Sequence, residues 1–392
     1  MKSVYIVEAR RTPIGAFQKG LSSLTAAELG ASIIEGLLNK TGLDPAAIEL
    51  CIMGQVLQAG YGMNPARQAA LKGGLKQETT AYTINQVCGS GMRSIFDGAG
   101  QIMTGQVDLA LVGGMESMSR APHVAELRPG CKFGSVEMKD TMLIDGLWDI
   151  FNDYHMGITA ENLAEKFGIS REAQDQFSAD SQTKAAKAQS EGRFRDEIIP
   201  VTIKTRKEDI VVTEDESIRA DTTADSLAAL KPAFKKDGTV TAGNASTLND
   251  GAAALILASE EAIKKYNLTP LARIVSIGQA GVDPAIMGHG PVPASRSTLE
   301  RAGWKVNDLD LVESNEAFAV QSLCVMKEMD FDPSKVNVNG GAIALGHPIG
   351  CSGSRIVVTL IHEMHKRNAA KGLATLCIGG GMGIALTVEI AK

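Results

Sequence analysis

Residues 83–105 read TINQVCGSGMRSIFDGAGQIMTG, and this stretch decides the fold. A short alternating run typical of a strand ends at Cys88, and from Met92 onward the apolar residues recur at the spacing of one helical face. Cys88 is therefore predicted to lie in a strand-to-helix turn, where free N–H groups and the helix dipole favour an anion. The sequence predicts a nucleophilic thiol with a lowered pKa. A buried structural cysteine is the alternative, and this stretch alone does not separate the two.

The composition is typical of a soluble globular protein. A length of 392 residues predicts two or three domains, and 44% of the residues are hydrophobic and 21% charged. A net charge of −6 and an aromatic content of 4% argue against nucleic-acid binding. Six scattered cysteines without a CxxC pair, and an N-terminus that reads as a strand, predict a reduced cytoplasmic location. No apolar run is long enough to cross a membrane.

Three regions of the chain differ in pattern. Residues 1–118, together with 248–270, alternate apolar strands with helical segments, which indicates an α/β domain. Residues 119–247 contain helical stretches and dense charge but few long apolar strands, so we expect an insertion that lies over the core. Residues 271–392 return to the α/β pattern.

The third region repeats the first. SGMRSI, which begins at Ser90, resembles SGSRIV, which begins at Ser352. DLALVGGMES resembles ATLCIGGGMG near the C-terminus, and AAIELCIMGQ resembles NDLDLVESNE. Three matches in the same order at a nearly constant offset predict two similar α/β halves, with the functional site where corresponding loops meet.

Three further reactive residues lie in the third region: Asn315 in SNEAF, His347 in GHPIG and Cys377 in LATLCIGGG. Each has a structural explanation by itself, since asparagine caps helices, histidine fits a turn and a cysteine can end an apolar run. Together with Cys88 they are expected near the carboxyl ends of strands, where α/β proteins bind ligands. A nucleophilic thiol, a histidine base and oxyanion donors are what acyl transfer through a thioester requires.

The motifs along the whole chain resemble those of the thiolases. They are NQVCGSGM, GGMESMSRAPH, YHMGITAEN, VTAGNASTLNDGAA, GVDPAIMG, NEAFA, NVNGGAIALGHPIG and GLATLCIGGG, in family order. The resemblance is greatest to the biosynthetic branch with acetyl-CoA C-acetyltransferase activity, and a broader-chain 3-ketoacyl-CoA thiolase of fatty-acid degradation is the alternative. It implies a five-layered αβαβα core of two duplicated halves, with an inserted loop domain that binds coenzyme A and contributes to a homotetramer.

The resemblance also implies a role for each reactive residue. Cys88 would carry the acetyl group, His347 would activate it as a base, and Cys377 would exchange protons with the α-carbon or the leaving thiol. One oxyanion hole would combine the His347 side chain with a water held by Asn315. The other would consist of the backbone N–H groups of Cys88 and Gly379. With a second thiol near neutral pKa as the base, condensation of two acetyl-CoA molecules needs no metal and no cofactor besides the coenzyme A thioesters that are its substrates.

Substrate-binding positions also carry over from the resemblance. Those expected to hold coenzyme A are Arg219, Ser226 and Ser246. The pantetheine tunnel would be lined by Leu147, Met156 and Phe234. The remaining positions are His155, which would line the acyl pocket, and Met287, Ala317 and Phe318. Small-molecule acyl-CoA esters are thus the expected partners.

Departures from the family pattern and two other enzyme classes bear on this interpretation. Cys351, Met382 and His289 are unusual residues for their positions, and they leave the acyl-chain preference open. A dinucleotide-binding G-x-G-x-x-G motif is excluded because Ile384 stands at its third glycine. A decarboxylating β-ketoacyl synthase generally offers histidine or asparagine where this chain has a second cysteine. Two thiols in one site also suggest a reversible Cys88–Cys377 disulfide.

Overall fold

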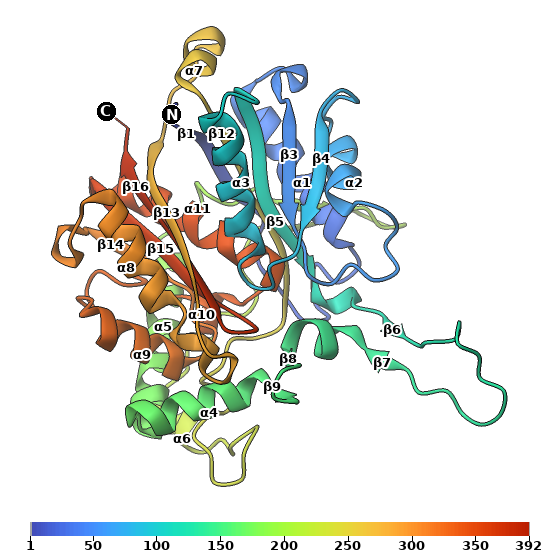
Figure 1. Cartoon of the computed structure of the whole chain (residues 1–392), viewed down its shortest axis with the longest axis vertical. Coiled ribbons are helices and arrows are strands. Elements are labelled where there is room, and N and C mark those ends of the chain that lie inside the picture. Colours follow the sequence, from blue (N-terminus) through green and yellow to red (C-terminus); the bar gives the residue numbers. More distant parts are fainter. Residues whose placement is uncertain (1, 392) are drawn as a thin grey trace.

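Two sets of strands with the same connectivity form the centre of the molecule in the computed structural model, which describes residues 2–391 (Figure 1). The first set consists of β1 (Tyr5–Arg11), β3 (Leu50–Gly54), β4 (Thr80–Ile84), β5 (Leu109–Ser117) and β12 (Asn249–Ala258). The second set consists of β13 (Ala272–Gly281), β14 (Leu311–Ser314), β15 (Lys371–Ile378) and β16 (Met382–Ile390). The short β2 (Gly15–Ala16) pairs with the start of β12.

The pairing is the same within each set. β3 lies between β4 and β5 in parallel pairs, and β12 runs antiparallel to both β5 and β1. In the second set β14 and β15 are parallel, and β16 runs antiparallel to both β15 and β13. Val336 makes a parallel bridge to Val312 of β14, at the place that β4 occupies in the first set. The two sets join where β1 pairs with β13, so the predicted duplication is confirmed.

Helices cover both outer faces and fill the space between the two sets. α1 (Ala26–Thr41) and α2 (Pro65–Lys72) pack on the first set, and α8 (Pro291–Ala302) and α9 (Ala319–Met329) on the second. α3 (Ser90–Met103) and α11 (Ile349–Arg367) lie between them. Side chains alternate accordingly, because Ala110 and Val112 of β5 face the central helices while Leu109 and Leu111 face α1. The predicted αβαβα layering is therefore confirmed.

Capping residues set the ends of these helices. Thr25 and Glu28 form a capping box at the start of α1, and Gly42 ends the helix with a φ of 65°. Shorter helices connect the main elements: α7 (Glu260–Tyr266), α10 (Ala342–Leu345) and the helical turns Pro45–Ala47, Met118–Arg120, Met142–Leu147, Pro284–His289 and Val306–Asp308.

Two glycines let the central helices cross with their backbones in contact. Gly91 on α3 and Gly353 on α11 are equivalent positions of the two repeated motifs. A Cβ on Gly91 would lie 2.8 Å from a backbone nitrogen of α11, and one on Gly353 would overlap the backbone of α3. Cys88 precedes α3 and His347 precedes α11. The crossing therefore brings the two halves' loops, with these residues, to the same part of the molecule.

Helices and short hairpins build the segment between β5 and β12. Its elements are β6 (His123–Val124), β7 (Lys139–Asp140), β8 (Trp148–Asp149), β9 (Tyr154–His155), α4 (Met156–Phe167), α5 (Arg171–Ser190), β10 (Val201–Ile203), β11 (Ile210–Val212) and α6 (Ala224–Ala228). The β6–β7 hairpin projects from the body as an arm (Figure 1). Arg11 of β1 anchors the segment to the core, because its buried guanidinium pairs with Asp215 at 2.7 Å and Glu197 at 2.6 Å.

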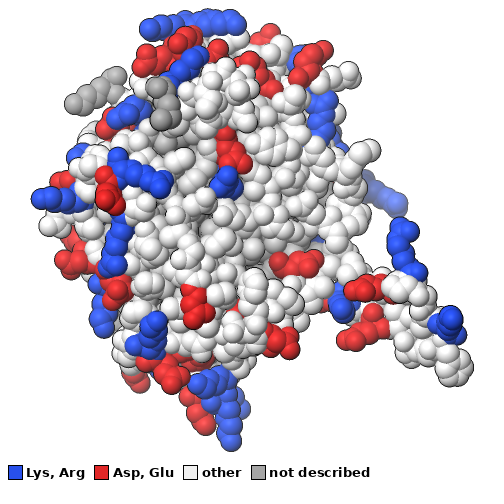
Figure 2. Space-filling view, viewed as in Figure 1, with Lys and Arg blue, Asp and Glu red and all other residues white. Residues whose placement is uncertain are grey.

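The surface carries acidic and basic side chains in mixture. On the face shown in Figure 2 the two signs are interspersed, most of them toward the rim, and no broad basic patch is present on that face. Among residues 2–391, no helix has the length and apolar character that crossing a membrane requires.

Candidate active site

A cavity of about 390 Å³ lies where both halves meet the segment between β5 and β12. Its reactive side chains are those of Cys88 and His347, and the backbone of Gly379 lies beside them. Most of the predicted substrate-binding residues also line it: Leu147, His155, Met156, Phe234, Ser246, Met287, Ala317 and Phe318. The structure thus brings together residues that are up to about three hundred positions apart in the chain.

The turn before α3 fixes the position of Cys88. β4 ends at Ile84, and α3 begins at Ser90. The Ser90 hydroxyl accepts from the Gln86 nitrogen at 2.8 Å and donates to the Val87 carbonyl at 2.6 Å. Val87 has a φ of 46°, a left-handed conformation that β-branched residues rarely adopt. Cys88 therefore lies just before the helix N-terminus, as predicted, on a backbone held in a strained conformation.

Burial dominates the electrostatics of the Cys88 thiol. It raises the pKa of Cys88 to about 11, although hydrogen bonds from the Gly379 N–H and from its own N–H lower it in part. The predicted lowering of this pKa is therefore wrong, because desolvation outweighs the helix N-terminus. The same two N–H groups converge on the sulfur, which is the arrangement that an oxyanion hole at this position needs.

His347 lies between α10 and α11, with its ring held from one side. Its Nδ1 is 2.6 Å from the Ser352 hydroxyl and 3.5 Å from the Asn315 side-chain nitrogen. Ser352 also donates to the Pro348 carbonyl at 3.0 Å, so Nδ1–H donates to Ser352 and Nε2 keeps its lone pair. Within residues 2–391 that Nε2 is buried without a hydrogen-bond partner.

Burial, with a smaller contribution from Arg355, lowers the pKa of His347 to about 3. The imidazole is therefore neutral at physiological pH and is able to accept a proton. Ser352 did not emerge from the sequence, although a hydroxyl one turn into the helix after GHP is a signal for such a partner.

Cys377 and Asn315 do not line the cavity but adjoin its reactive groups, Cys377 beside Cys88 and Asn315 beside His347. Cys377, near the end of β15, is buried among apolar residues that include Met156 and Phe318. Burial and the nearby Cys88 raise the pKa of Cys377, so the predicted near-neutral value is wrong for the resting site. Asn315 follows β14, and its Oδ1 is buried and unpaired within residues 2–391. It does not cap a helix, because α9 begins only at Ala319.

Aromatic rings form the cavity wall next to the start of α4. The His155 ring stacks on Phe234 at 4.6 Å, and Phe234 meets Phe318 edge-on at 6.4 Å. His155 Nδ1 accepts from the Gly157 nitrogen at 3.0 Å, and burial lowers the pKa of His155, so the ring is neutral. A Cβ on Gly157 would overlap the Phe234 ring, which explains the glycine.

Two predicted coenzyme A contacts lie outside this cavity. Arg219 and Ser226 are both exposed, and neither lines it. The backbone N–H of Arg219 donates to the Gln182 side-chain oxygen at 2.7 Å. Ser226 forms a capping box with Thr223 at the start of α6. The structure therefore separates these two residues from the reactive groups.

The three unusual residues also lie outside the cavity. Cys351 is fully buried in the central helical layer, and burial raises its pKa to about 12. His289 stacks on Phe167 at 5.6 Å instead of facing the cavity. Met382 packs at the edge of the core at the start of β16.

Glu116, which the sequence did not single out, joins the two halves beneath the site. Its buried carboxylate accepts N–H groups of Val56 and Leu57 after β3 and of Gly350 in the first turn of α11. Burial raises its pKa to about 7, while these three hydrogen bonds act in the opposite direction. The carboxylate thus ties the start of α11, three residues after His347, to the first set of strands.

The whole chain is similar to known proteins. Residues 4–261 match the thiolase N-terminal domain, and residues 268–390 match the thiolase C-terminal domain. The acetyl-CoA acetyltransferase of Paracoccus denitrificans is 57% identical over 389 residues, which cover 99% of this chain and 100% of that protein. The probable acetyl-CoA acetyltransferase of Escherichia coli K12 is 53% identical over 390 residues, or 99% of each chain.

Solved structures agree over the full length. The acetyl-CoA acetyltransferase of Bacillus anthracis superposes with a TM-score of 0.97 at 48% identity, covering 100% of this chain and 99% of that one. Human mitochondrial 3-ketoacyl-CoA thiolase in complex with CoA superposes with a TM-score of 0.96 at 46% identity, covering 100% and 98%. With both domains matched in order, the chain belongs to the thiolase family.

Proposed function

We propose that the protein is an acetyl-CoA C-acetyltransferase that condenses two acetyl-CoA molecules to acetoacetyl-CoA and coenzyme A, reversibly, through an acetyl-Cys88 thioester. The observation that carries the proposal is the cavity in which the Cys88 thiol, the His347 imidazole and the Gly379 N–H meet, with Cys377 directly behind it. Relatives named acetyl-CoA acetyltransferase support the same activity.

In the first half-reaction, Cys88 attacks the thioester carbon of acetyl-CoA and His347 Nε2 accepts the thiol proton. Because burial keeps both groups neutral at rest, proton transfer accompanies the attack instead of preceding it. The N–H groups of Cys88 and Gly379 stabilise the oxyanion of the tetrahedral intermediate. Coenzyme A leaves as the thiol with the proton of Cys377, which leaves Cys377 as the thiolate and His347 protonated at Nε2.

In the second half-reaction, the Cys377 thiolate removes a proton from the methyl group of a second acetyl-CoA. A thiol whose pKa is raised gives a stronger base, which suits a weakly acidic carbon. The His347 side chain and a water held by Asn315 stabilise the enolate oxygen. The carbanion attacks the acetyl carbon and forms the new carbon–carbon bond. The Cys88 sulfur leaves and takes its proton back from His347, so both cysteines end as thiols and acetoacetyl-CoA is released.

A short acyl chain fits the aromatic wall. His155 stacks on Phe234, which meets Phe318 edge-on, and this row of rings limits the space beside the reactive groups. The broader-chain 3-ketoacyl-CoA thiolase is the less favoured alternative, because relatives named acetyl-CoA acetyltransferase reach 57% identity and the human 3-ketoacyl-CoA thiolase 46%.

The loop domain, residues 119–247, would bind coenzyme A. One core half would consist of residues 1–118 and 248–270, and the other of residues 271–392. Arg219 and Ser226 would hold the nucleotide end of the ligand at the entrance, outside the cavity. Arg219→Ala should raise KM for coenzyme A thioesters with little change in kcat, since the contact is remote from the chemistry. An unchanged KM would place the nucleotide end elsewhere.

A homotetramer in the cytoplasm, without metal or cofactor, completes the proposal. The connection between β6 and β7 exposes four apolar side chains: Leu127, Phe133, Val136 and Met138. An exposed apolar arm is typical of a surface that a second copy covers. Light scattering after size-exclusion chromatography should give four times the chain mass, and a monomer would contradict the tetramer.

The activity is tested by thiolysis of acetoacetyl-CoA, followed through the absorbance of its magnesium enolate. Cys88→Ser should abolish it, and acetyl-CoA without an acceptor should acetylate the Cys88 peptide, as mass spectrometry detects. Cys377→Ser should keep this acetylation but lower condensation by about 10²–10³-fold. The reason is that an alcohol loses its proton far less readily than a thiol and so provides little of the anion that acts as the base. Cys351→Ser is the matched control, since that thiol lies outside the cavity. Acetylation of Cys377 instead would overturn the roles.

A further inference from the structure

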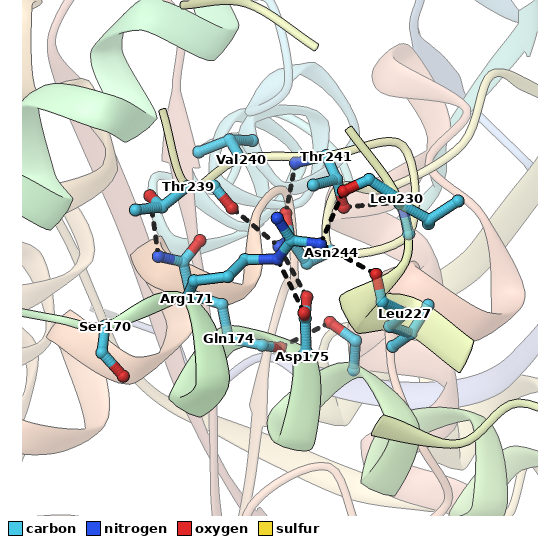
Figure 3. Close-up of polar contacts among 12 residues, drawn as sticks. Ser170, Arg171, Gln174, Asp175, Leu227, Leu230, Thr239, Val240, Thr241 and Asn244 are labelled. Atoms are coloured by element: carbon cyan, nitrogen blue, oxygen red, sulfur yellow. Dashed lines mark hydrogen bonds and ion pairs between the residues drawn. The ribbon is translucent and has the colours of Figure 1, made fainter. Parts of the chain in front are cut away.

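A buried polar cluster outside the cavity supports two of its walls (Figure 3). Its centre is Asp175 on α5, whose carboxylate accepts the Arg171 Nε–H at 2.6 Å and the Asn244 amide N–H at 2.9 Å. Asp175 is 2% exposed and Asn244 is fully buried. None of the three side chains lines the cavity, so their role is not contact with the substrate.

Asn244 closes the turn that leads into one wall. Its side-chain oxygen accepts the Thr241 nitrogen at 2.7 Å, and its side-chain nitrogen donates to the Thr239 carbonyl at 3.0 Å. Its backbone carbonyl accepts the Ala319 nitrogen at the start of α9 at 2.9 Å. The wall residues Ala245 and Ser246 follow directly, and the Ser246 nitrogen donates to the Ala317 carbonyl at 3.0 Å.

Arg171 holds the segment that leads into a second part of the cavity wall. Its Nη2 donates to the Leu227 carbonyl at 2.8 Å and the Leu230 carbonyl at 2.9 Å (Figure 3). Ala233 and Phe234, which line the cavity, follow three and four residues later. Gly243 lets the two segments approach each other, because a Cβ there would lie 2.6 Å from the Leu230 side chain.

Neither wall segment belongs to a long helix or a strand, so its position depends on such side-chain bonds. Glu161 on α4 independently holds residues 239 and 240, which restricts the influence of Asn244 to the residues after them. We propose that Arg171, Asp175 and Asn244 form a positioning network that sets the spacing of the two walls and thereby the affinity for the acyl-CoA ligand. The proposal rests on the proposed function, because it assumes that this cavity receives the pantetheine arm.

The network separates ligand affinity from the chemistry of Cys88. Its residues touch neither Cys88 nor His347, so their loss should change binding and leave the reactive groups in place. Asn244→Ala should raise KM for acetyl-CoA and Kd for coenzyme A about tenfold, because it leaves a buried carboxylate oxygen and a buried N–H unpaired. The value of kcat should change less than threefold.

Three measurements on the full-length protein test this. Thiolysis gives KM and kcat, calorimetric titration with coenzyme A gives Kd, and mass spectrometry follows alkylation of the Cys88 peptide by iodoacetamide, which needs no coenzyme A site. Arg171→Lys keeps the charge but loses the fork that reaches both carbonyls, and it serves if Asn244→Ala fails to fold. Arg273→Ala is the control, since it breaks the partly exposed Arg273–Glu389 ion pair between β13 and β16.

The expected result is a raised Kd and KM with an unchanged alkylation rate in Asn244→Ala and Arg171→Lys, and wild-type values in Arg273→Ala. An unchanged Kd in folded variants, or a fall in kcat without a change in KM, would overturn the positioning network. A wild-type protein that binds no coenzyme A and shows no thiolysis would instead refute the proposed function.

Discussion

The Ser352 hydroxyl lies 2.6 Å from Nδ1 of His347, and both side chains are buried in the loop and first turn of α11. This bond fixes the ring plane and leaves Nε2 as the proton acceptor for Cys88. Ser352→Ala should lower kcat about 10- to 100-fold, because an unpaired buried nitrogen costs about 1–3 kcal/mol and the ring loses its orientation. Steady-state thiolysis measures the change.

Ser354 provides the matched control for that substitution. It is also fully buried in α11, and its hydroxyl bonds the Ala253 and Cys351 carbonyls without touching His347. Ser354→Ala should lower the melting temperature to a similar degree and leave kcat near the wild-type value. Equal losses of kcat in the two variants would show that Ser352 acts only through stability.

Val87 holds a left-handed conformation, with a φ of 46°, immediately before the nucleophile. Glycine adopts this conformation without steric cost, whereas alanine does not. Val87→Gly should therefore be more stable than Val87→Ala by about 1 kcal/mol, which reverses the usual order. Chemical denaturation gives both free energies of unfolding.

Thr183, which is exposed in the middle of α5, provides the comparison, because Thr183→Gly and Thr183→Ala should show the usual order of stability. There the alanine variant should be the more stable of the pair by about 1 kcal/mol. A Val87 pair that follows the same order as the Thr183 pair would mean that the turn relaxes and carries no strain.

The pKa of about 11 for Cys88 predicts how its reactivity depends on pH. Only the thiolate is alkylated, so between pH 7 and 9 the rate should rise about tenfold per unit without a plateau. Iodoacetamide labelling of the Cys88 peptide, quantified by mass spectrometry, separates it from the exposed Cys131. A plateau near neutral pH would indicate the low-pKa thiolate that the helix N-terminus alone predicts.

The sequence predicted what depends on local pattern and repetition. The duplicated strands and the turn at Cys88 follow from apolar spacing and glycines close in the chain. The cavity walls followed from the family resemblance, and His155, Phe234 and Phe318 lie there.

Properties set by distant segments were not predictable in this way. Loops far away in the chain bury Cys88 and so raise its pKa. The helix N-terminus, which local sequence identifies, predicts a lowered pKa instead. Asn244 meets Asp175 across 69 residues, so no spacing reveals the pair. The loop after β14 continues to Phe318, and Asn315, whose side-chain nitrogen lies 3.5 Å from His347 Nδ1, does not cap α9.

Cys88 and Cys377 lie close enough for the charge of Cys88 to raise the pKa of Cys377. A disulfide needs Cα atoms about 4.4–6.8 Å apart, a range that a modest loop movement reaches from such a pair. We expect hydrogen peroxide to oxidise Cys88 to the sulfenic acid, and Cys377 to displace water and form the disulfide. Because burial raises both pKa values, inactivation should be slow at pH 7 and faster at pH 9.

Oxidation at both pH values, followed by an activity assay, dithiothreitol and non-reducing digestion, tests this redox switch. The wild type should lose activity, show a Cys88–Cys377 linked peptide and recover on reduction. Cys351→Ser should behave like the wild type, because Cys351 packs in the central layer away from the cavity and competes poorly as a partner. Cys377→Ser should form no linked peptide, and its Cys88 should proceed to the sulfinic acid, which dithiothreitol does not reverse. Retained activity after oxidation, or inactivation without the linked peptide, would show that the two thiols are held apart by packing.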